Sequence, residues 1–241
     1  MKGVILAGGK GTRLNPLTCI TNKHLLPVYN KPMVLYPMET LISMGVTDIL
    51  IVSGGEYIGK FTEFLGNGSK FGVNLTYKVQ EESGGIAEAL GLAKDFAQGG
   101  SITVILGDNI FENKFIPKID IDEKRAYMFV KKVENPERFG VISMIKDKYE
   151  GKKMIVEKPK EHIGDHAVVG LYIYPNDVFE IIPTLEKSDR GELEVTDLNN
   201  YYLSKDRGII NVIKGYWSDA GTMDSLFNSS SWAKNKFLLD K

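Results

Sequence analysis

Short apolar runs alternate with helical patterns through the first half of the chain. The runs predict strands over residues 4–7, 49–53, 75–79 and 102–106. Between them, apolar positions at helical spacing predict one helix over residues 33–44, ended by Gly45, and another along residues 86–96. Strands that alternate with helices favour crossover connections, so this half predicts a mostly parallel sheet.

The second half of the chain is richer in strand patterns and has shorter connections. It predicts strands over residues 126–133, 141–145, 154–157 and 168–174. Helices are predicted over about residues 176–182 and 194–203, and again after Thr222. The whole pattern indicates an α/β protein with a mixed, mostly parallel sheet flanked by helices, to which a β-rich half is added.

Composition removes several classes of partner and location. The chain has 241 residues, with 31 acidic and 30 basic side chains and a formal charge of -1, so its overall field does not favour nucleic acid or an anionic membrane. The sequence contains neither an apolar run long enough for a membrane span nor a signal peptide, and we expect a cytoplasmic protein. The lone cysteine, Cys19, fits a reducing compartment and is expected to be a buried or half-buried thiol rather than a nucleophile.

A glycine-rich loop directly follows the first predicted strand. In Gly8-Gly9-Lys10-Gly11-Thr12-Arg13, three glycines allow backbone N–H groups to turn toward one point where a polyphosphate can sit. Arg13, and Lys23 ten residues later, supply cations for such a ligand. The loop lacks the spacing of a dinucleotide fingerprint or a P-loop. Its alternative reading is an ordinary glycine turn beside two surface cations.

Candidate carboxylates follow other predicted strands. Asp108 comes directly after the apolar run 102–106, where its alternative role is to cap a turn. Asp219 follows Tyr216-Trp217, and its alternative role is the N-cap of the last helix. Because ligands of open α/β sheets collect beyond the carboxyl ends of strands, Gly8, Gln80 and Asp108 should converge at one edge.

Several of these motifs occur together in a known order. The chain resembles the sugar-1-phosphate nucleotidyltransferases, and among them those that transfer a thymidylyl group, over nearly its whole length. The segments that carry the resemblance are Gly8 to Leu14 with Pro16, Thr18, Lys23 and Pro27; Tyr77-Lys78-Val79-Gln80; Gly107-Asp108-Asn109-Ile110; Glu157-Lys158-Pro159; Arg190-Gly191-Glu192-Leu193-Glu194; and Trp217-Ser218-Asp219-Ala220-Gly221-Thr222.

The resemblance implies a Rossmann-like, glycosyltransferase-A-like fold in a single domain, 1–241. Residues 1–114 would form its nucleotide-binding half, and residues 115–241 its sugar-phosphate-binding half with the C-terminal helix. The implied reaction joins dTTP and glucose-1-phosphate to dTDP-glucose and pyrophosphate, with Mg²⁺ as cofactor. Long members of the family continue into further helices, so for this chain regulation and a tetramer are not implied; a homo-oligomer is left open.

The resemblance also implies roles for individual residues. Arg13, Lys23 and Asp108 would be catalytic, and Asp108 and Asp219 would bind the metal. The nucleotide would be bound by Leu6, Ala7, Gly8, Gly9, Gly11, Thr12, Arg13, Lys23, Gln80, Gly85 and Asp108, with Gln80 on the base. The sugar phosphate would be bound by Asn109, Gly140, Glu157, Lys158, Gly170 and Arg190.

Other functions remain open from the sequence. UTP is a plausible second nucleotide, because uracil and thymine differ by one methyl group. A metal-dependent glycosyltransferase would use an Asp-x-Asp motif, and Asp120-Ile121-Asp122 has those letters, although it reads as a solvated loop. A sugar-nucleotide sensor without catalysis would be expected to lose a cation or a carboxylate, whereas Arg13 and Asp219 are present. His24, His162 and His166 lack metal-ligand spacing and are expected to be bystanders.

Overall fold

The computed structural model describes residues 1–82, 84–113, 116, 119–143 and 153–239. The chain forms two compact units, and each is assembled from segments that are far apart in sequence. The first unit comprises Met1–Ser83, Ile105–Lys114 and Gly215–Lys241, and the second comprises Gly84–Val104 and Phe115–Lys214. These bounds differ from the predicted division at residue 114; a single domain stays a prediction.

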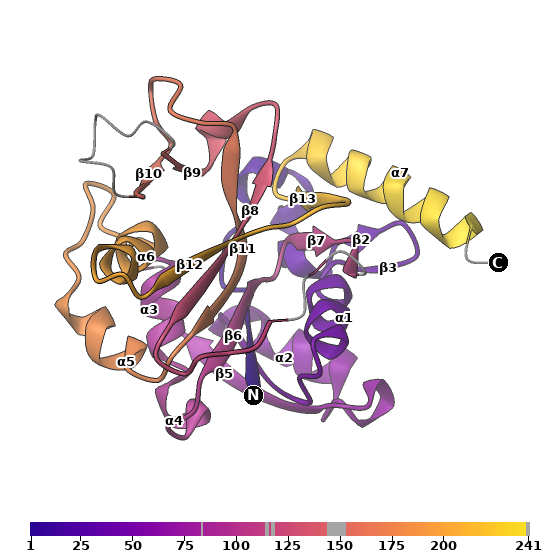
Figure 1. Cartoon of the computed structure of the whole chain (residues 1–241). Helices are drawn as coiled ribbons and strands as arrows, with labels where there is room; N and C mark the ends of the chain where they lie inside the picture. Colours follow the sequence, from indigo (N-terminus) through magenta and orange to yellow (C-terminus); the bar gives the residue numbers. More distant parts are fainter. Residues whose placement is uncertain (83, 114–115, 117–118, 144–152, 240–241) are drawn as a thin grey trace. The chain divides into compact units, whose positions relative to one another are not determined.

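A parallel sheet forms the centre of the first unit. Its strands β1 (Lys2–Leu6), β4 (Asp48–Gly54) and β5 (Asn74–Gln80) pair in the order β1-β4-β5. Helices α1 (Leu35–Ser43) and α2 (Gly55–Leu65) pack on these strands, which is why β1 and β4 are apolar and buried almost throughout (Figure 1). Strand β6 (Ile102–Leu106) ends in this unit, and just after it the Gly107 N–H donates to the Leu6 carbonyl at 2.9 Å.

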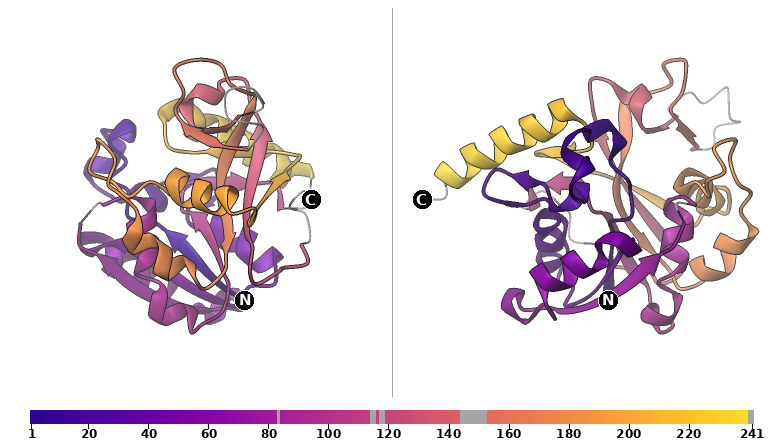
Figure 2. Two further views of the ribbon diagram at one scale, coloured as in Figure 1. Left: turned by 60° about the vertical axis from the view of Figure 1, so that its left-hand side comes forward. Right: turned by 180° about the vertical axis from the view of Figure 1, so that it is seen from behind.

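Smaller elements complete the first unit. Strands β7 (Asn109–Phe111) and β13 (Trp217–Asp219) pair antiparallel, as do β2 (Pro27–Val28) and β3 (Lys31–Pro32). Helix α7 (Met223–Leu239) packs against β2 and β13, as the further views in Figure 2 show in yellow. The buried side chains that join these elements are Val28, Met33, Tyr36, Ile110, Ala220 and Ala233. Short 3-10 helices lie at Thr12–Leu14, Leu17–Cys19, Lys23–Leu25 and Ser69–Phe71.

The second unit is built on a largely antiparallel sheet. Its strands lie in the order β10 (Ile155–Glu157), β9 (Gly140–Ile142), β11 (His166–Tyr174), β8 (Ala126–Lys132) and β12 (Gly208–Val212), of which β8 and β12 pair in parallel. The helices are α3 (Ile86–Gly91), α4 (Lys94–Ala97), α5 (Val178–Ile181) and α6 (Val195–Ser204), with 3-10 turns at Pro136–Arg138 and Ile182–Thr184. Nearly every side chain of β8 and β11 is buried, so these strands form the core of the unit.

The predicted α/β class is confirmed, and each predicted strand is present. The ends differ by at most two residues except for the strand 141–145, whose last two residues lie outside the described part of the chain. The helix predicted along residues 86–96 is divided into α3 and α4. Helix α2 was not predicted because Gly55 and Gly59 weaken its helical pattern, although Phe61 and Leu65 are buried at helical spacing.

The structure also bears on the predictions for Cys19 and for membrane-spanning segments. The expectation that Cys19 is buried or half-buried is wrong: the thiol is exposed, because its 3-10 turn directs Thr18 inward instead. None of the helices in the described part of the chain combines the length and the hydropathy that a membrane span requires.

Candidate active site

The glycines of the loop after β1 lie where other side chains need space. A Cβ atom on Gly8 would lie 2.3 Å from the Gln80 Oε1, and one on Gly9 would lie 3.2 Å from the Lys23 Cε. Gly11 has a left-handed backbone with φ +67, and a Cβ there would lie 2.9 Å from the Lys23 Cβ. Gln80 therefore lies against Gly8, and Lys23, which lies over Gly9 and Gly11, pairs with Asp108, so the predicted convergence of Gly8, Gln80 and Asp108 is present.

The residues around this loop hold its shape. Leu6 and Ala7 are buried at the end of β1, where the Ala7 carbonyl accepts hydrogen bonds from Asn22 and Ser53. The Thr18 hydroxyl lies 2.9 Å from the Gly11 carbonyl and donates to it. Sequence reasoning gave Thr18 no role of its own, because only the folded loop brings its hydroxyl back to Gly11.

Thr12 and Arg13 are exposed on the first 3-10 turn, which the buried Leu14 anchors. The anchored turn directs the Arg13 guanidinium toward Gly221, where its Nη2 lies 3.1 Å from the position a Cβ would take. Arg13 is thus accessible to a ligand while its backbone is fixed, as expected for a phosphate-binding cation.

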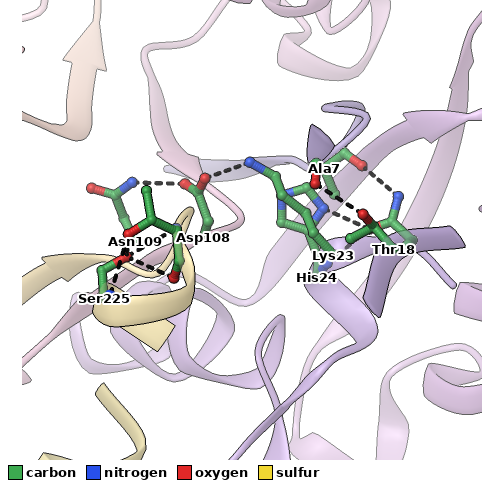
Figure 3. A network of polar contacts seen from close by, with 10 residues as sticks. Ala7, Thr18, Lys23, His24, Asp108, Asn109 and Ser225 are labelled. Atoms are coloured by element: carbon green, nitrogen blue, oxygen red, sulfur yellow. Dashed lines mark hydrogen bonds and ion pairs between the residues drawn. The ribbon is translucent and has the colours of Figure 1, made fainter. Parts of the chain in front are cut away.

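Lys23 and Asp108 form an ion pair between segments that are far apart in sequence. The Lys23 Nζ lies 2.5 Å from the Asp108 Oδ2, and the two side chains are only 13% and 12% exposed (Figure 3). Burial would raise the pKa of Asp108, but the Lys23 charge and hydrogen bonds from Lys23 and Asn109 hold that pKa below its ordinary value. Asp108 is therefore an ionised carboxylate at neutral pH.

His24, next to Lys23, has a structural position. It is buried, its Nδ1 lies 2.7 Å from the Asn22 Oδ1, and its ring packs against Gly107. Burial first, and then the Lys23 charge, lowers the pKa of His24 to about 3, so its ring is neutral at pH 7. His24 thus supports the turn that carries Lys23.

Asp219 is brought to Asp108 by the pairing of β13 with β7. In this pairing Asp219 stands opposite Asn109, and the Ala220 N–H donates to the Asp108 carbonyl at 2.8 Å. A Cβ on Gly221 would lie 3.5 Å from the Asp108 Oδ2 and 3.7 Å from the Asp219 Oδ2. Both carboxylates and the Arg13 guanidinium therefore surround one small volume beside a residue without a side chain.

This donor set fits magnesium. Mg²⁺ is commonly held by one or two carboxylates, with phosphate and water oxygens completing its shell. In the described ranges no group of three or more His, Cys, Asp or Glu side chains could hold a metal ion by itself. A metal ion at Asp108 and Asp219 would consequently need further ligands from a substrate.

Asn109 was predicted to bind the sugar phosphate, but it lies in the first unit beside the carboxylates. It is 2% exposed, its Nδ2 donates to the Asp108 Oδ1 at 2.9 Å, and its Oδ1 accepts from the Trp217 Nε1 at 2.7 Å. These contacts orient Asp108, and a contact of Asn109 with the sugar stays a prediction.

In the second unit, three residues gather around Glu157. The Thr196 hydroxyl donates to the Glu157 Oε2 at 2.8 Å, and a Cβ on Gly140 would lie 3.3 Å from each of these two atoms. Burial, and after it the Glu157 charge, raises the pKa of Tyr172. Glu157 and Gly140 were selected from the sequence. Thr196 and Tyr172 were not selected, because neither belongs to a recognised motif and only the structure places them beside Glu157.

Lys158 has an unusual backbone. Its φ is +43, although it is not glycine and precedes Pro159, and its N–H donates to the Phe139 carbonyl at 3.0 Å. Such a conformation is costly and often accompanies function. The Lys158 Nζ lies 3.7 Å from the Glu157 Oε1 and is largely exposed, so it remains accessible to an anion.

The other predicted sugar-site residues also lie in the second unit. Gly170 is buried in β11, where the register with β8 shifts between Val168 and Tyr172. The Arg190 Nη2 lies 2.9 Å from the Glu194 Oε1, in a loop that precedes α6. Gly85, predicted on the nucleotide, is in this unit as well and directly contacts the backbone of Leu193.

The structure divides the predicted site residues into two groups. The first unit holds Leu6, Ala7, Gly8, Gly9, Gly11, Thr12, Arg13, Lys23, Gln80, Asp108, Asn109 and Asp219, and the second holds Gly85, Gly140, Glu157, Lys158, Gly170 and Arg190. The Asp120-Ile121-Asp122 segment contributes to neither group: Asp122 is exposed and accepts from the Lys124 N–H within its own loop.

Comparison with known proteins gives matches over nearly the whole chain. A family model described as nucleotidyl transferase matches residues 2–236. Glucose-1-phosphate thymidylyltransferase of Neisseria gonorrhoeae is 40% identical over 240 residues, covering 97% of this chain and 83% of the relative. The enzyme of the same name from Mycobacterium tuberculosis H37Rv is 39% identical over 243 residues, covering 97% and 82%.

Solved structures give the same result. A Bacillus anthracis protein assigned as a glucose-1-phosphate thymidylyltransferase, crystallised with sucrose, is 45% identical with a TM-score of 0.88, and the match covers 97% of this chain and 95% of that one. A UDP-glucose pyrophosphorylase bound to UDP-glucose has a TM-score of 0.81 at 23% identity, covering 98% of each chain. This second likeness is one of fold alone.

Proposed function

The chain belongs to the nucleotidyl transferase family, and on that premise we propose that it transfers a thymidylyl group from dTTP to glucose-1-phosphate, releasing pyrophosphate. The arrangement around Gly221 is the observation that carries the proposal. Two carboxylates and the Arg13 guanidinium lie within 3.7 Å of one position, and Lys23 pairs with one of the carboxylates. A triphosphate needs such a combination of cations and metal-binding oxygens.

In the proposed reaction, the residues of the first unit hold and neutralise the triphosphate. Arg13 and Lys23 bind its phosphate oxygens, and Asp108 and Asp219 hold Mg²⁺. Magnesium, when bound, offsets the charge that develops on the phosphates. Lys23 pairs with Asp108, and its ammonium group has further N–H donors with which it can bind a phosphate oxygen.

The residues of the second unit are proposed to bind the sugar phosphate. Glu157, oriented by Thr196, accepts hydrogen bonds from sugar hydroxyls, and Lys158 and Arg190 bind the phosphate. A phosphate oxygen of the sugar phosphate is already ionised at neutral pH and attacks the α-phosphorus, displacing pyrophosphate. The reaction therefore needs alignment and charge compensation rather than a side-chain base.

Base selection is assigned to Gln80. Its amide offers one donor and one acceptor, which match the edge that thymine and uracil share. The thymine methyl group alone is worth about 1 to 3 kcal/mol of discrimination. UTP is accordingly the second candidate substrate, and the names of the relatives favour dTTP.

The test is pyrophosphate release from glucose-1-phosphate in separate reactions with dTTP, UTP, CTP, ATP and GTP, with Mg²⁺ and with a chelator. We expect release with dTTP, lower or no release with UTP, and none when the chelator is present. Absence of release with every nucleotide would refute the proposed reaction. Calorimetric titration with dTDP-glucose would then separate a non-catalytic sensor, which binds it, from an enzyme for another sugar phosphate. A cytoplasmic location and a homo-oligomer stay predictions.

A further inference from the structure

Two segments of the second unit that are about a hundred residues apart in sequence are joined through their backbones. The Leu193 N–H donates to the Gly84 carbonyl at 2.8 Å, and the Ala87 N–H donates to the Leu193 carbonyl at 3.2 Å. Gly84 and Ala87 flank the start of α3, and Leu193 ends the loop that leads into α6. The two helices lie side by side (Figure 1). Leu193 thus uses both of its backbone polar groups on one short segment.

Gly85 lies at the centre of this junction. Its φ is +104, and a Cβ there would lie 2.5 Å from the Leu193 oxygen, 2.8 Å from the Leu193 nitrogen and 3.1 Å from the Glu192 Cβ. The first two atoms are backbone atoms held by the junction's own hydrogen bonds, so they cannot move aside independently. Glycine is therefore required at this position by the protein itself, whether or not a ligand lies against it.

The loop attached to Leu193 is closed on itself and carries Arg190. The Gly191 N–H donates to the Ser188 carbonyl at 2.7 Å, and the Ser188 N–H donates to the Glu192 carbonyl at 2.9 Å. The Glu194 Oε1 accepts from both the Ser188 hydroxyl at 2.7 Å and the Arg190 Nη2 at 2.9 Å. Because these bonds link both ends of the loop, a displacement of Leu193 would displace the Arg190 guanidinium as well.

We propose that Gly84–Ala87 positions Arg190: the two hydrogen bonds to Leu193, and the space left by the missing Gly85 side chain, hold the Arg190 loop where its guanidinium meets the phosphate of the sugar substrate. The inference rests on the proposed function for the role of Arg190, and gives Gly85 a role that acts through Arg190. It makes Gly85, which was predicted to bind the nucleotide, a positioning residue for the sugar phosphate.

The first test is a double-mutant cycle with Gly85→Ala and Arg190→Ala, read as the KM for glucose-1-phosphate. If Gly85 acts through Arg190, Gly85→Ala should raise this KM by about tenfold in the wild type and by less than about twofold in the Arg190→Ala background. A residue that only contacts the base would raise the KM for dTTP and leave the other KM unchanged. Equal effects of Gly85→Ala in both backgrounds would overturn the positioning role.

Two glycines provide matched controls for the backbone cost of the substitution. Gly45 and Gly191 have φ values of +80 and +75, and a Cβ on either would meet nothing within 4 Å. Gly45→Ala and Gly191→Ala therefore impose a left-handed alanine without the collision, and Gly191→Ala does so in the Arg190 loop. We expect both variants to keep the wild-type KM for glucose-1-phosphate. If Gly191→Ala raised the KM for glucose-1-phosphate as much as Gly85→Ala does, backbone strain in the loop would explain the effect, and the inference would be overturned.

A second measurement needs no glycine variant, in case Gly85→Ala does not fold. Hydrogen exchange of the wild-type protein is followed with and without glucose-1-phosphate, and we expect the Leu193 and Ala87 amides to gain protection together. In Arg190→Ala neither amide should respond. If the enzyme turns over dTTP and glucose-1-phosphate but the Leu193 and Ala87 amides do not gain protection together, the positioning role is refuted and the proposed function stands. Absence of both turnover and protection would overturn the proposed function together with the positioning role.

Discussion

Replacing Lys23 by methionine tests the ion pair that holds the candidate metal site in the unliganded protein. Methionine keeps most of the aliphatic stem that packs over Gly9 and Gly11, but removes the charge 2.5 Å from Asp108. With both side chains less than 15% exposed, Asp108 would remain buried without its cation, which typically costs about 3 to 5 kcal/mol. We expect the free energy of unfolding at pH 7, measured by urea titration, to fall by that amount.

The pH dependence of this loss follows from the direction of the pKa shifts. In the wild type the folded pKa of Asp108 lies below the unfolded value of 3.8, so its contribution to stability is present above pH 3.8 and is lost as the pH falls through the folded pKa. Without Lys23, burial raises the folded pKa of Asp108 above its unfolded value, so the destabilisation that Asp108 causes in the variant weakens as the pH is lowered from 7. The difference in free energy of unfolding between the wild type and Lys23→Met should therefore become smaller toward pH 4.

Lys31→Met is the matched control, because Lys31 pairs with Glu39 at the same 2.5 Å distance but with side chains 25% and 46% exposed. An exposed pair of this kind contributes about 0 to 1 kcal/mol. Saturating Mg²⁺ should restore more stability to Lys23→Met than to the wild type, since Asp108 is then open to the metal. A loss below about 1 kcal/mol at pH 7, or one that is independent of pH, would refute the reasoning.

Three further predictions concern other parts of the site. Asp219→Asn should lower kcat by about a hundredfold or more, measured as pyrophosphate release at saturating Mg²⁺, whereas Asp224→Asn on the exposed start of α7 should not; equal rates would remove Asp219 from the metal site. Thr196→Val should raise the KM for glucose-1-phosphate by up to about tenfold, because it removes one hydrogen bond to Glu157, and it should change kcat less. An unchanged KM would contradict the orienting role of Thr196. Because the folded pKa of His24 is lowered from 6.5 to about 3, the unfolded chain binds the proton more readily, so the free energy of unfolding of the wild type should fall as the pH drops below 6.5. In urea titrations, His24→Gln should lose less stability over the same pH range. An equal loss in both proteins would contradict the prediction.

Local patterns identified most of the elements, for physical reasons that single residues illustrate. Four of the five residues of Ile102–Leu106 are aliphatic because the strand is buried, and this signal does not depend on the rest of the chain. Helix α2 was missed because Gly55 and Gly59 oppose helix formation, and packing of Phe61 and Leu65 outweighs that local preference. The exposed Cys19 was misjudged because a thiol alone does not indicate which way a short turn will face.

The amino-acid sequence by itself determined which chemical groups are available: the glycines after β1, the cations Arg13 and Lys23, and carboxylates where strands end. Tertiary structure alone decided which of them meet. The pairing of β7 with β13 brings Asp219 to Asp108, and the Leu193 junction gives Gly85 a reason to be glycine. These contacts join residues about a hundred positions apart, and no local periodicity records such distances, because they depend on the packing of the whole unit.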